Sequence, residues 1–207
     1  MTLTTHQPKQ NKQKLTLAQF VKQIPDEVGR YELVNGEIMR TLPTRRHEDI
    51  ADFIARQFDK EVEKLNLSYR VSGRIVVRTE THDGTEQGRN PDVSVVERNI
   101  WEFNRSAYSA LFEPLQIAVE VVSTNWEDDY IDKLDEYQRL GIKEYWIVDY
   151  LAIASRSYLG NPKVPIVFVY LLDDNGAYQF EAYQEEEIII SKTFPELKIT
   201  TAQIINA

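Results

Sequence analysis

The chain has 207 residues and no cysteine, and its 24 lysines and arginines against 33 aspartates and glutamates give a formal net charge of −9. Without cysteine it cannot form disulfides, cysteine-ligated zinc sites, iron–sulfur clusters or thiol nucleophiles. No apolar run approaches the ~18 residues of a membrane span, and the first 14 residues lack the apolar core of a secretory signal. We therefore expect a cytoplasmic protein with no membrane partner, with residues 1–14 as a disordered polar tail and residues 15–207 as a single domain.

The first elements expected along the chain are a short helix, a hairpin and a long helix. Thr16 is a suitable N-cap for the short helix, which ends at Pro25. The dipeptide Asn35-Gly36 lies between two apolar-containing runs and predicts a hairpin, because a type I′ turn needs positive φ at both central residues. Residues 46–65 carry apolar side chains at helical spacing and predict the first long helix.

Strand-like segments fill the middle of the chain. Alternating or continuous apolar residues predict strands at residues 69–79, 91–97 and 115–123. Residues 80–90 are rich in Thr, Gly, Asp and Asn and are predicted to form a loop. Residues 98–114 carry scattered aromatic side chains and are predicted to form a packed loop or a short helix.

A second amphipathic helix is expected between Asn125 and Gly141, followed by a strand at residues 144–150. Its expected buried stripe consists of Tyr130, Ile131, Leu134 and Tyr137. The order strand, helix, strand predicts a parallel pair with a right-handed crossover. Further strands are expected at residues 166–172, 177–184 and 186–191. The whole order predicts an α/β or α+β fold with a mixed sheet.

Two acidic residues lie within or beside apolar strands. Glu120 belongs to the segment 115–123, which is apolar on both faces, and a carboxylate there is costly unless it is paired, protonated or bound to a metal. Asp92 directly follows Pro91 at the start of another strand. Two simpler interpretations stay open: Glu120 is satisfied by a buried Lys or Arg, and Asp92 is a turn residue.

Lys133 lies on the second helix, near its expected buried stripe. At 100° per residue it falls about 60° from Tyr130, at the edge of the stripe, so its ammonium group can reach the strand ends. The alternative is an ordinary surface lysine paired with Asp129 or Tyr137. Asp129 itself lies in the first turn of the helix, where acidic residues favour the positive end of the helix dipole.

Several common motifs are absent from the sequence. There is no Walker A loop, no G-x-G-x-x-G and no G-x-S-x-G. The pair His47-Glu48 has no second histidine at position 51, so the zinc-protease pattern fails, and with three histidines in all a multi-histidine metal site is not expected. A metal held by oxygen ligands stays open.

Three longer segments together carry a family resemblance: NPDVSVVE (90–97), AVEVVSTN (118–125) and DKLDEYQRLGIKEYWIVDY (132–150). They resemble the putative restriction endonuclease family that is abundant in cyanobacteria, a branch of the PD-(D/E)xK nuclease superfamily. YELVNGEI and the pair Arg46-His47 also match the pattern of this family. The resemblance covers roughly residues 30–205.

The resemblance implies a restriction-endonuclease-like fold, with a mixed sheet flanked by helices, an extra N-terminal hairpin and extra C-terminal strands. It also implies hydrolysis of phosphodiester bonds in DNA that depends on Mg²⁺ or Mn²⁺. By resemblance, Asp92 and Glu120 bind the metal together with the backbone carbonyl of Val121. Two such carboxylates suit a hard cation, since Mg²⁺ prefers oxygen ligands.

The resemblance has one departure at the catalytic lysine. The superfamily usually carries a lysine two positions after the second acid, and this chain has Val122 there. Lys133 matches a lysine that has moved to the following helix, and by resemblance it is the third catalytic residue. His47 and Tyr137 are expected at the wall of the same site.

Two other functions stay open beside an active endonuclease. An inactive nuclease-fold scaffold that binds nucleic acid or protein would agree with Val122 and the acidic charge. A different hydrolase with a carboxylate pair, such as a glycosidase, would use the same residue types. DNA is the expected partner, bound weakly, with a dependence on metal and salt. A homodimer is also expected, because two symmetric sites can cut both strands of a duplex.

Overall fold

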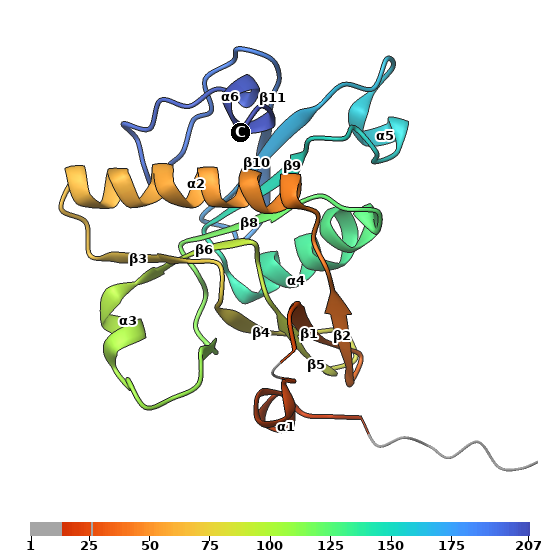
Figure 1. Ribbon diagram of the computed structural model, residues 1–207, viewed down its shortest axis with the longest axis vertical. Helices are drawn as coiled ribbons and strands as arrows, with labels where there is room; N and C mark the ends of the chain where they lie inside the picture. The colour runs from red at the N-terminus through yellow and green to blue at the C-terminus, as the bar shows by residue number, and fades with distance from the viewer. Residues whose placement is uncertain (1–13, 26) are drawn as a thin grey trace, which may run out of the picture.

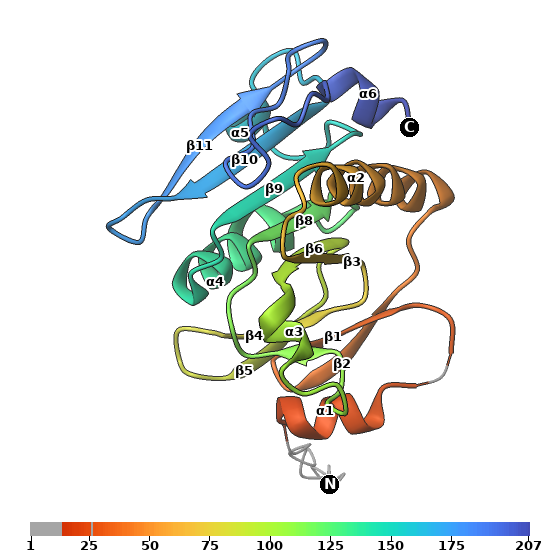
Figure 2. The same cartoon turned by 90° about the vertical axis from the view of Figure 1, so that its left-hand side faces the viewer.

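Two mixed β-sheets and the helices that cover them make up the computed structural model, which describes residues 14–25 and 27–207 (Figures 1 and 2). The tail predicted for residues 1–14 therefore lies, apart from Lys14, outside the described residues. None of the described helices combines the length and the apolar character that crossing a membrane requires. The sequence predicted one mixed sheet, whereas the strands divide between two.

The six-stranded sheet has the order β11-β10-β9-β8-β6-β3, with β8 and β9 as its parallel pair. Its strands are β3 (Tyr69–Ser72), β6 (Val93–Glu97), β8 (Ile117–Val121), β9 (Glu144–Asp149), β10 (Ile166–Leu172) and β11 (Tyr178–Tyr183). All residues of β8 and β9 are buried. The continuous apolar character of these strands reflects burial on both faces of the sheet.

Helices cover the two faces of this sheet. Helix α2 (Arg45–Lys64) packs on one face and α4 (Lys133–Leu140) on the other (Figure 2). Alternate residues of β8 contribute to opposite clusters, because side chains along a strand point to opposite sides. Val119 belongs to the cluster of Phe58 from α2, whereas Ala118 belongs to the cluster of Tyr137 from α4. The prediction of a strand covered on both sides is therefore confirmed.

The strand–helix–strand unit predicted between residues 115 and 150 is also confirmed. Strands β8 and β9 pair in parallel, and Gly141 ends α4 in the left-handed conformation with φ 90°. The helix opens with a π-helical turn, η1 (Asp128–Asp132), which accommodates an extra residue and rotates the side chains relative to an ideal α-helix. The prediction for Ile131 is wrong: it points roughly a quarter-turn away from Tyr130 and is 50% exposed, whereas Tyr130 is buried.

The five-stranded sheet carries the N-terminal hairpin and has the order β2-β1-β5-β4-β7. Its strands are β1 (Arg30–Val34), β2 (Glu37–Thr41), β4 (Val76–Glu80), β5 (Glu86–Arg89) and β7 (Ala110–Leu111). The predicted hairpin is confirmed, with Asn35 at φ 53° and Gly36 at φ 83°. The predicted short helix is α1 (Leu17–Gln23), which Thr16 caps and whose Leu17 and Phe20 pack in a small core of this sheet.

Two predictions for the middle of the chain are wrong. The strand predicted at residues 69–79 divides into β3 and β4, which belong to different sheets. Between them lies Gly73, where a Cβ atom would stand 2.8 Å from the carbonyl oxygen of Asp92. The predicted loop at residues 80–90 contains β5, which pairs antiparallel with β4. In both places the pairing partner, rather than local composition, decides the conformation.

The C-terminal part contains one further correction. Strands β10 and β11 confirm two predicted strands, but the strand predicted at residues 186–191 is reduced to a single bridge between Ile188 and Thr200. Ile188 and Ile190 are 51% and 58% exposed, so this segment buries Ile189 and Ser191 and leaves the other side exposed. The remaining helices are α3 (Arg98–Glu102), α5 (Arg156–Leu159) and α6 (Thr201–Ile205).

Candidate active site

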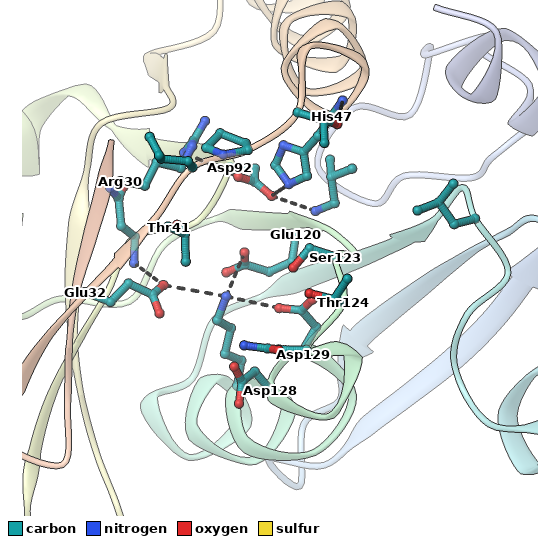
Figure 3. A pocket seen from close by; sticks show the side chains of 18 of the residues that line it. Arg30, Glu32, Thr41, His47, Asp92, Glu120, Ser123, Thr124, Asp128 and Asp129 are labelled. Atoms are coloured by element: carbon teal, nitrogen blue, oxygen red, sulfur yellow. Dashed lines mark hydrogen bonds and ion pairs between the residues drawn. The ribbon is translucent and has the colours of Figure 1, made fainter. Parts of the chain in front are cut away.

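A cavity of about 410 Å³ lies where residues of both sheets meet the first turn of α2 (Figure 3). Its wall comes from β1, from the segment that joins β2 to α2, from the residues before β6, from the end of β8, and from η1 with the start of α4. The three residues predicted to be catalytic, Asp92, Glu120 and Lys133, all line this cavity. Asp92 precedes β6, Glu120 lies on β8 and Lys133 lies on α4, so residues that are distant in the sequence meet in the folded chain.

Asp92 directly precedes β6 and has only 6% of its surface exposed. Its Oδ2 accepts the backbone N–H of Val121 at 2.7 Å and lies 3.2 Å from Nε2 of His47, while Oδ1 lies 3.4 Å from Nη1 of Arg30. Burial alone would raise the pKa of this carboxyl group, but the hydrogen bond and charge of His47 and the charge of Arg30 lower it. Asp92 is therefore held ionised.

His47 lies in the first turn of α2, which the side chain of Thr44 caps through the backbone N–H of His47. Burial opposes protonation of the imidazole, but the hydrogen bond and charge of Asp92 raise the pKa of His47 above its usual value. Its Nδ1 has no hydrogen-bond partner. The structure thus places His47 beside Asp92 at the site wall, where the resemblance had placed it.

Glu120 lies on β8 and is 3% exposed. The hydroxyl of Tyr137 donates to its Oε1 at 2.7 Å, and Nζ of Lys133 lies 3.0 Å from its Oε2. Burial raises the pKa of Glu120 well above its usual value, and the neighbouring charges of Asp92 and Asp129 raise it further against the opposing effect of Lys133. The charge of Lys133 therefore does not fully offset the effect of burial on the ionised form of Glu120.

Lys133 is the first residue of α4, and its ammonium group points at three carboxylates. Its Nζ lies 3.0 Å from Oε2 of Glu120, 3.0 Å from Oδ1 of Asp129 and 3.6 Å from Oε1 of Glu32 (Figure 3). Burial opposes the charge, but Asp129 and Glu120 raise the pKa of Lys133 well above its usual value. The pairing with Asp129 foreseen in the surface interpretation is present, whereas the surface position is not, since Lys133 is 7% exposed.

Comparison with known families now identifies the chain's relatives. A model of the Uma2 family, described as "Putative restriction endonuclease", matches residues 17–202. The chain belongs to the Uma2 family. A solved structure described as a putative nuclease belonging to DUF820, from Anabaena variabilis ATCC 29413, is similar with a TM-score of 0.68 and 17% identity, over 93% of this chain and 98% of that one. No curated protein matches the chain in sequence.

The structural likeness confirms the predicted fold class, and the Uma2 match confirms the family resemblance. Val122 is fully buried in the apolar cluster on the α4 side, so its side chain faces the core rather than the cavity. Tyr137 is fully buried behind Glu120 and is not among the cavity-lining residues. Val121 lines the cavity and binds Asp92 through its N–H.

Four charged residues of the cavity wall were missed from the sequence. Arg30 and Glu32 lie on β1 and line the cavity with Asp128 and Asp129 of η1. The alternation in RYELV places Arg30 and Glu32 on one face and the buried Tyr31 and Leu33 on the other, and this pattern was the available signal. Asp129 was interpreted through the helix dipole and as a surface partner of Lys133, but it is 5% exposed, and burial raises its pKa to about 6 against the opposing charge of Lys133.

The donor set of the cavity fits a hard divalent cation. Within the part of the chain that the structure describes, no three His, Asp or Glu residues form a ready-made metal cluster. Mg²⁺ does not require one, because it commonly takes one or two carboxylates and keeps several waters. Asp92 and Glu120 line the same cavity, and burial, followed by the nearby charges of Asp92 and Asp129, raises the pKa of Glu120, an effect that a bound cation would oppose.

Proposed function

We propose that this Uma2 protein is an endonuclease that hydrolyses phosphodiester bonds of DNA with Mg²⁺ or Mn²⁺. The observation that carries the proposal is the meeting of Asp92, Glu120 and Lys133 on the wall of one cavity from a loop, a strand and a helix. Two carboxylates and a lysine at this place supply the cation ligands and the ammonium group that phosphodiester hydrolysis uses. The family description supports the reaction class.

Asp92 and Glu120 would hold the cation, with the backbone carbonyl of Val121 as the third protein ligand. The cation, when bound, supplies positive charge that stabilises the phosphate in the transition state. Asp92 is prepared for this role because His47 and Arg30 lower its pKa and keep it ionised. Glu120 is held by Tyr137 at the oxygen that does not contact Lys133.

Lys133 would act on the reacting groups directly. Its ammonium nitrogen lines the cavity and carries three N–H donors, so it can orient a water molecule or donate to a phosphate oxygen. The group stays protonated although burial opposes its charge, because Asp129 and Glu120 raise the pKa of Lys133. Protonated Lys133 therefore serves as a hydrogen-bond donor and a positive charge rather than as a general base.

A scaffold without activity is the second candidate, and one observation favours it. The ammonium group of Lys133 already contacts Glu120, Asp129 and Glu32, so substrate would have to compete with three carboxylates for it. The two candidates differ in whether a bound cation draws Glu120 away from Lys133. They make opposite predictions for cleavage and the same prediction for the fold.

Plasmid cleavage separates the two candidates. Wild-type protein with Mg²⁺ or Mn²⁺ is expected to convert supercoiled DNA to the nicked form, and Asp92→Asn, Glu120→Gln and Lys133→Met are expected to stop it. Lys143→Met is the matched control, because Lys143 is exposed and lies outside the cavity wall. Absence of cleavage of DNA and RNA by the wild type with either metal would establish the scaffold function instead.

A homodimer would suit the cutting of duplex DNA, because two symmetric sites can address both strands. Strand β11 supports this proposal: it lies at the edge of the six-stranded sheet, and Phe180 on it is 59% exposed. An unpaired edge of this kind can add a strand from a second copy. Light scattering at micromolar concentration tests the proposal, and the mass of one chain would refute it.

A further inference from the structure

Strand β1 presents two charged residues to the candidate site from the second sheet. Arg30 and Glu32 are two positions apart and therefore point to the same side of the strand. Arg30 contacts Asp92, and Glu32 contacts Lys133, so one strand face reaches an acid and the lysine of the site (Figure 3). Tyr31 and Leu33, on the opposite face, are buried in the core of the five-stranded sheet and fix the orientation of the strand.

Glu32 makes three contacts, each with a different kind of partner. Its Oε1 accepts the backbone N–H of Asn90 at 3.0 Å and lies 3.6 Å from Nζ of Lys133. Its Oε2 lies 3.5 Å from Nη1 of Arg89. The carboxylate is thus fixed by one hydrogen bond and two cations and stands between the site lysine and a buried arginine.

Arg89 is in turn held by α4. Its Nε and Nη2 donate to the two carboxylate oxygens of Glu136 at 2.8 and 2.7 Å, and Thr79 donates to Glu136 at 2.5 Å. Arg89 and Glu136 are 3% and 4% exposed. Glu136 follows Lys133 by three positions on α4, so both side chains lie on the same side of the helix. A closed ring results, from Lys133 through Glu32, Arg89 and Glu136 back to the helix.

We propose that Glu32 is a positioning residue for Lys133, and that Arg89 and Glu136 hold it in place. An ammonium group has three donors, and the carboxylates of Glu120, Asp129 and Glu32 lie around it within 3.6 Å. Of these three carboxylates, Glu32 alone belongs to the five-stranded sheet. It therefore draws the ammonium group of Lys133 away from α4 and toward the cavity. Without Glu32, Lys133 retains Asp129, four residues before it, and Glu120.

The kinetic consequence of this inference rests on the proposed function, but the placement of Lys133 by Glu32 can be tested without any measurement of activity. Glu32→Gln removes the charge and keeps the size and the acceptor for Asn90. Glu37→Gln is the matched control, because Glu37 is an exposed glutamate on the partner strand of the same hairpin. Thermal unfolding of both variants establishes that the hairpin remains folded.

The deciding measurement is the rate at which an amine-reactive reagent modifies Lys133 at one fixed pH, followed by peptide mass spectrometry. We expect a several-fold faster modification in Glu32→Gln and an unchanged rate in Glu37→Gln, because of these two glutamates Glu32 is the one that contacts the ammonium group. An unchanged rate in Glu32→Gln, or an equal rise in Glu37→Gln, overturns the positioning role. Neither outcome depends on whether the protein cleaves DNA.

Kinetic constants provide a second test when the wild-type protein cleaves DNA. A positioning role predicts that kcat of Glu32→Gln falls about tenfold while KM stays within about twofold, since Lys133 acts in the transition state and not in binding the DNA backbone. A rise in KM with unchanged kcat would instead assign Glu32 to substrate binding and overturn the proposal. Wild-type protein that cleaves nothing refutes the proposed function, while the modification rate still decides the role of Glu32.

Discussion

Oε2 of Glu120 lies 3.0 Å from the ammonium nitrogen of Lys133, so a helix residue occupies the place beside the second acid of the site. The strand cannot supply this lysine, because Val122 is buried in the apolar cluster under α4. The π-helical turn η1 directly precedes Lys133 and sets the direction in which α4 presents it. The backbone thus departs from an ideal α-helix directly before the residue whose ammonium group contacts Glu120.

Replacing Lys133 by Met removes the charge and keeps much of the side-chain stem. We expect cleavage to fall by at least about 100-fold, because the ammonium group stabilises charge that develops in the transition state. Metal binding is expected to persist, since the change leaves Asp92 and Glu120 in place. Nicking rates and isothermal titration with Mn²⁺ measure the two effects, with Lys143→Met as the control. Cleavage at the wild-type rate would remove Lys133 from the mechanism.

Asp129 predicts a pH dependence of stability in the absence of metal. Burial, ahead of the neighbouring charges, raises its pKa from 3.8 to about 6. Between these values the folded chain binds more protons than the unfolded chain, so the contribution of this group to stability falls as the pH rises from about 4 to about 6. Asp129→Asn does not titrate there. Its free energy of unfolding, minus that of the wild type, is expected to rise across this interval and then level off.

Urea unfolding at several pH values between 4 and 7 measures this difference. Asp174→Asn is a suitable control, because Asp174 is exposed in the turn between β10 and β11. A difference for Asp129→Asn that stays flat, or that falls as the pH rises, would contradict the environment described for this carboxyl group.

The sequence revealed the parts of the site that break a local pattern. Glu120 stood out because a carboxylate inside a doubly covered strand is costly, and the structure pairs it with a buried lysine, as one interpretation held. Asp92 and Lys133 were weak signals separately and became specific only through the family resemblance. Glu32 and Arg30 escaped notice, because polar residues that alternate in a hairpin usually face solvent.

The predictions that failed depended on contacts distant in the sequence. The strand predicted at residues 69–79 divides between the two sheets, and the chain at Gly73 passes too close to Asp92 for a side chain. Strand β5 forms inside a segment of loop-like composition because β4 and β1 lie on either side of it. Local propensity carries no information about these neighbours, so the second sheet could not be found from the sequence, and the alternation in RYELV alone did not show that Glu32 faces the site.

Divalent cations are expected to stabilise the folded protein. At a free concentration of about 100 times the dissociation constant, binding to the folded state alone adds about 2.7 kcal/mol, which corresponds to a rise of roughly 5 to 10 °C in the melting temperature of a chain of this size. Asp92→Asn and Glu120→Gln should lose most of this rise, and EDTA should abolish it. Glu37→Gln is the control, and an equal shift in all four proteins would place the cation elsewhere.

Glu136→Gln tests the buried ion pair that joins the second sheet to α4. Arg89 is 3% exposed, and the loss of the charged, bidentate partner leaves the buried guanidinium with Glu32, at 3.5 Å, as its remaining carboxylate partner. We expect the free energy of unfolding to fall by about 3 kcal/mol. The matched control is Asp135→Asn on the same helix, where Asp135 pairs with Arg139 at 2.9 Å in an accessible position and the expected loss is below about 1 kcal/mol. Equal losses in urea unfolding would mean that Arg89 finds another partner, and the ring that reaches Glu32 would then lack its support from α4.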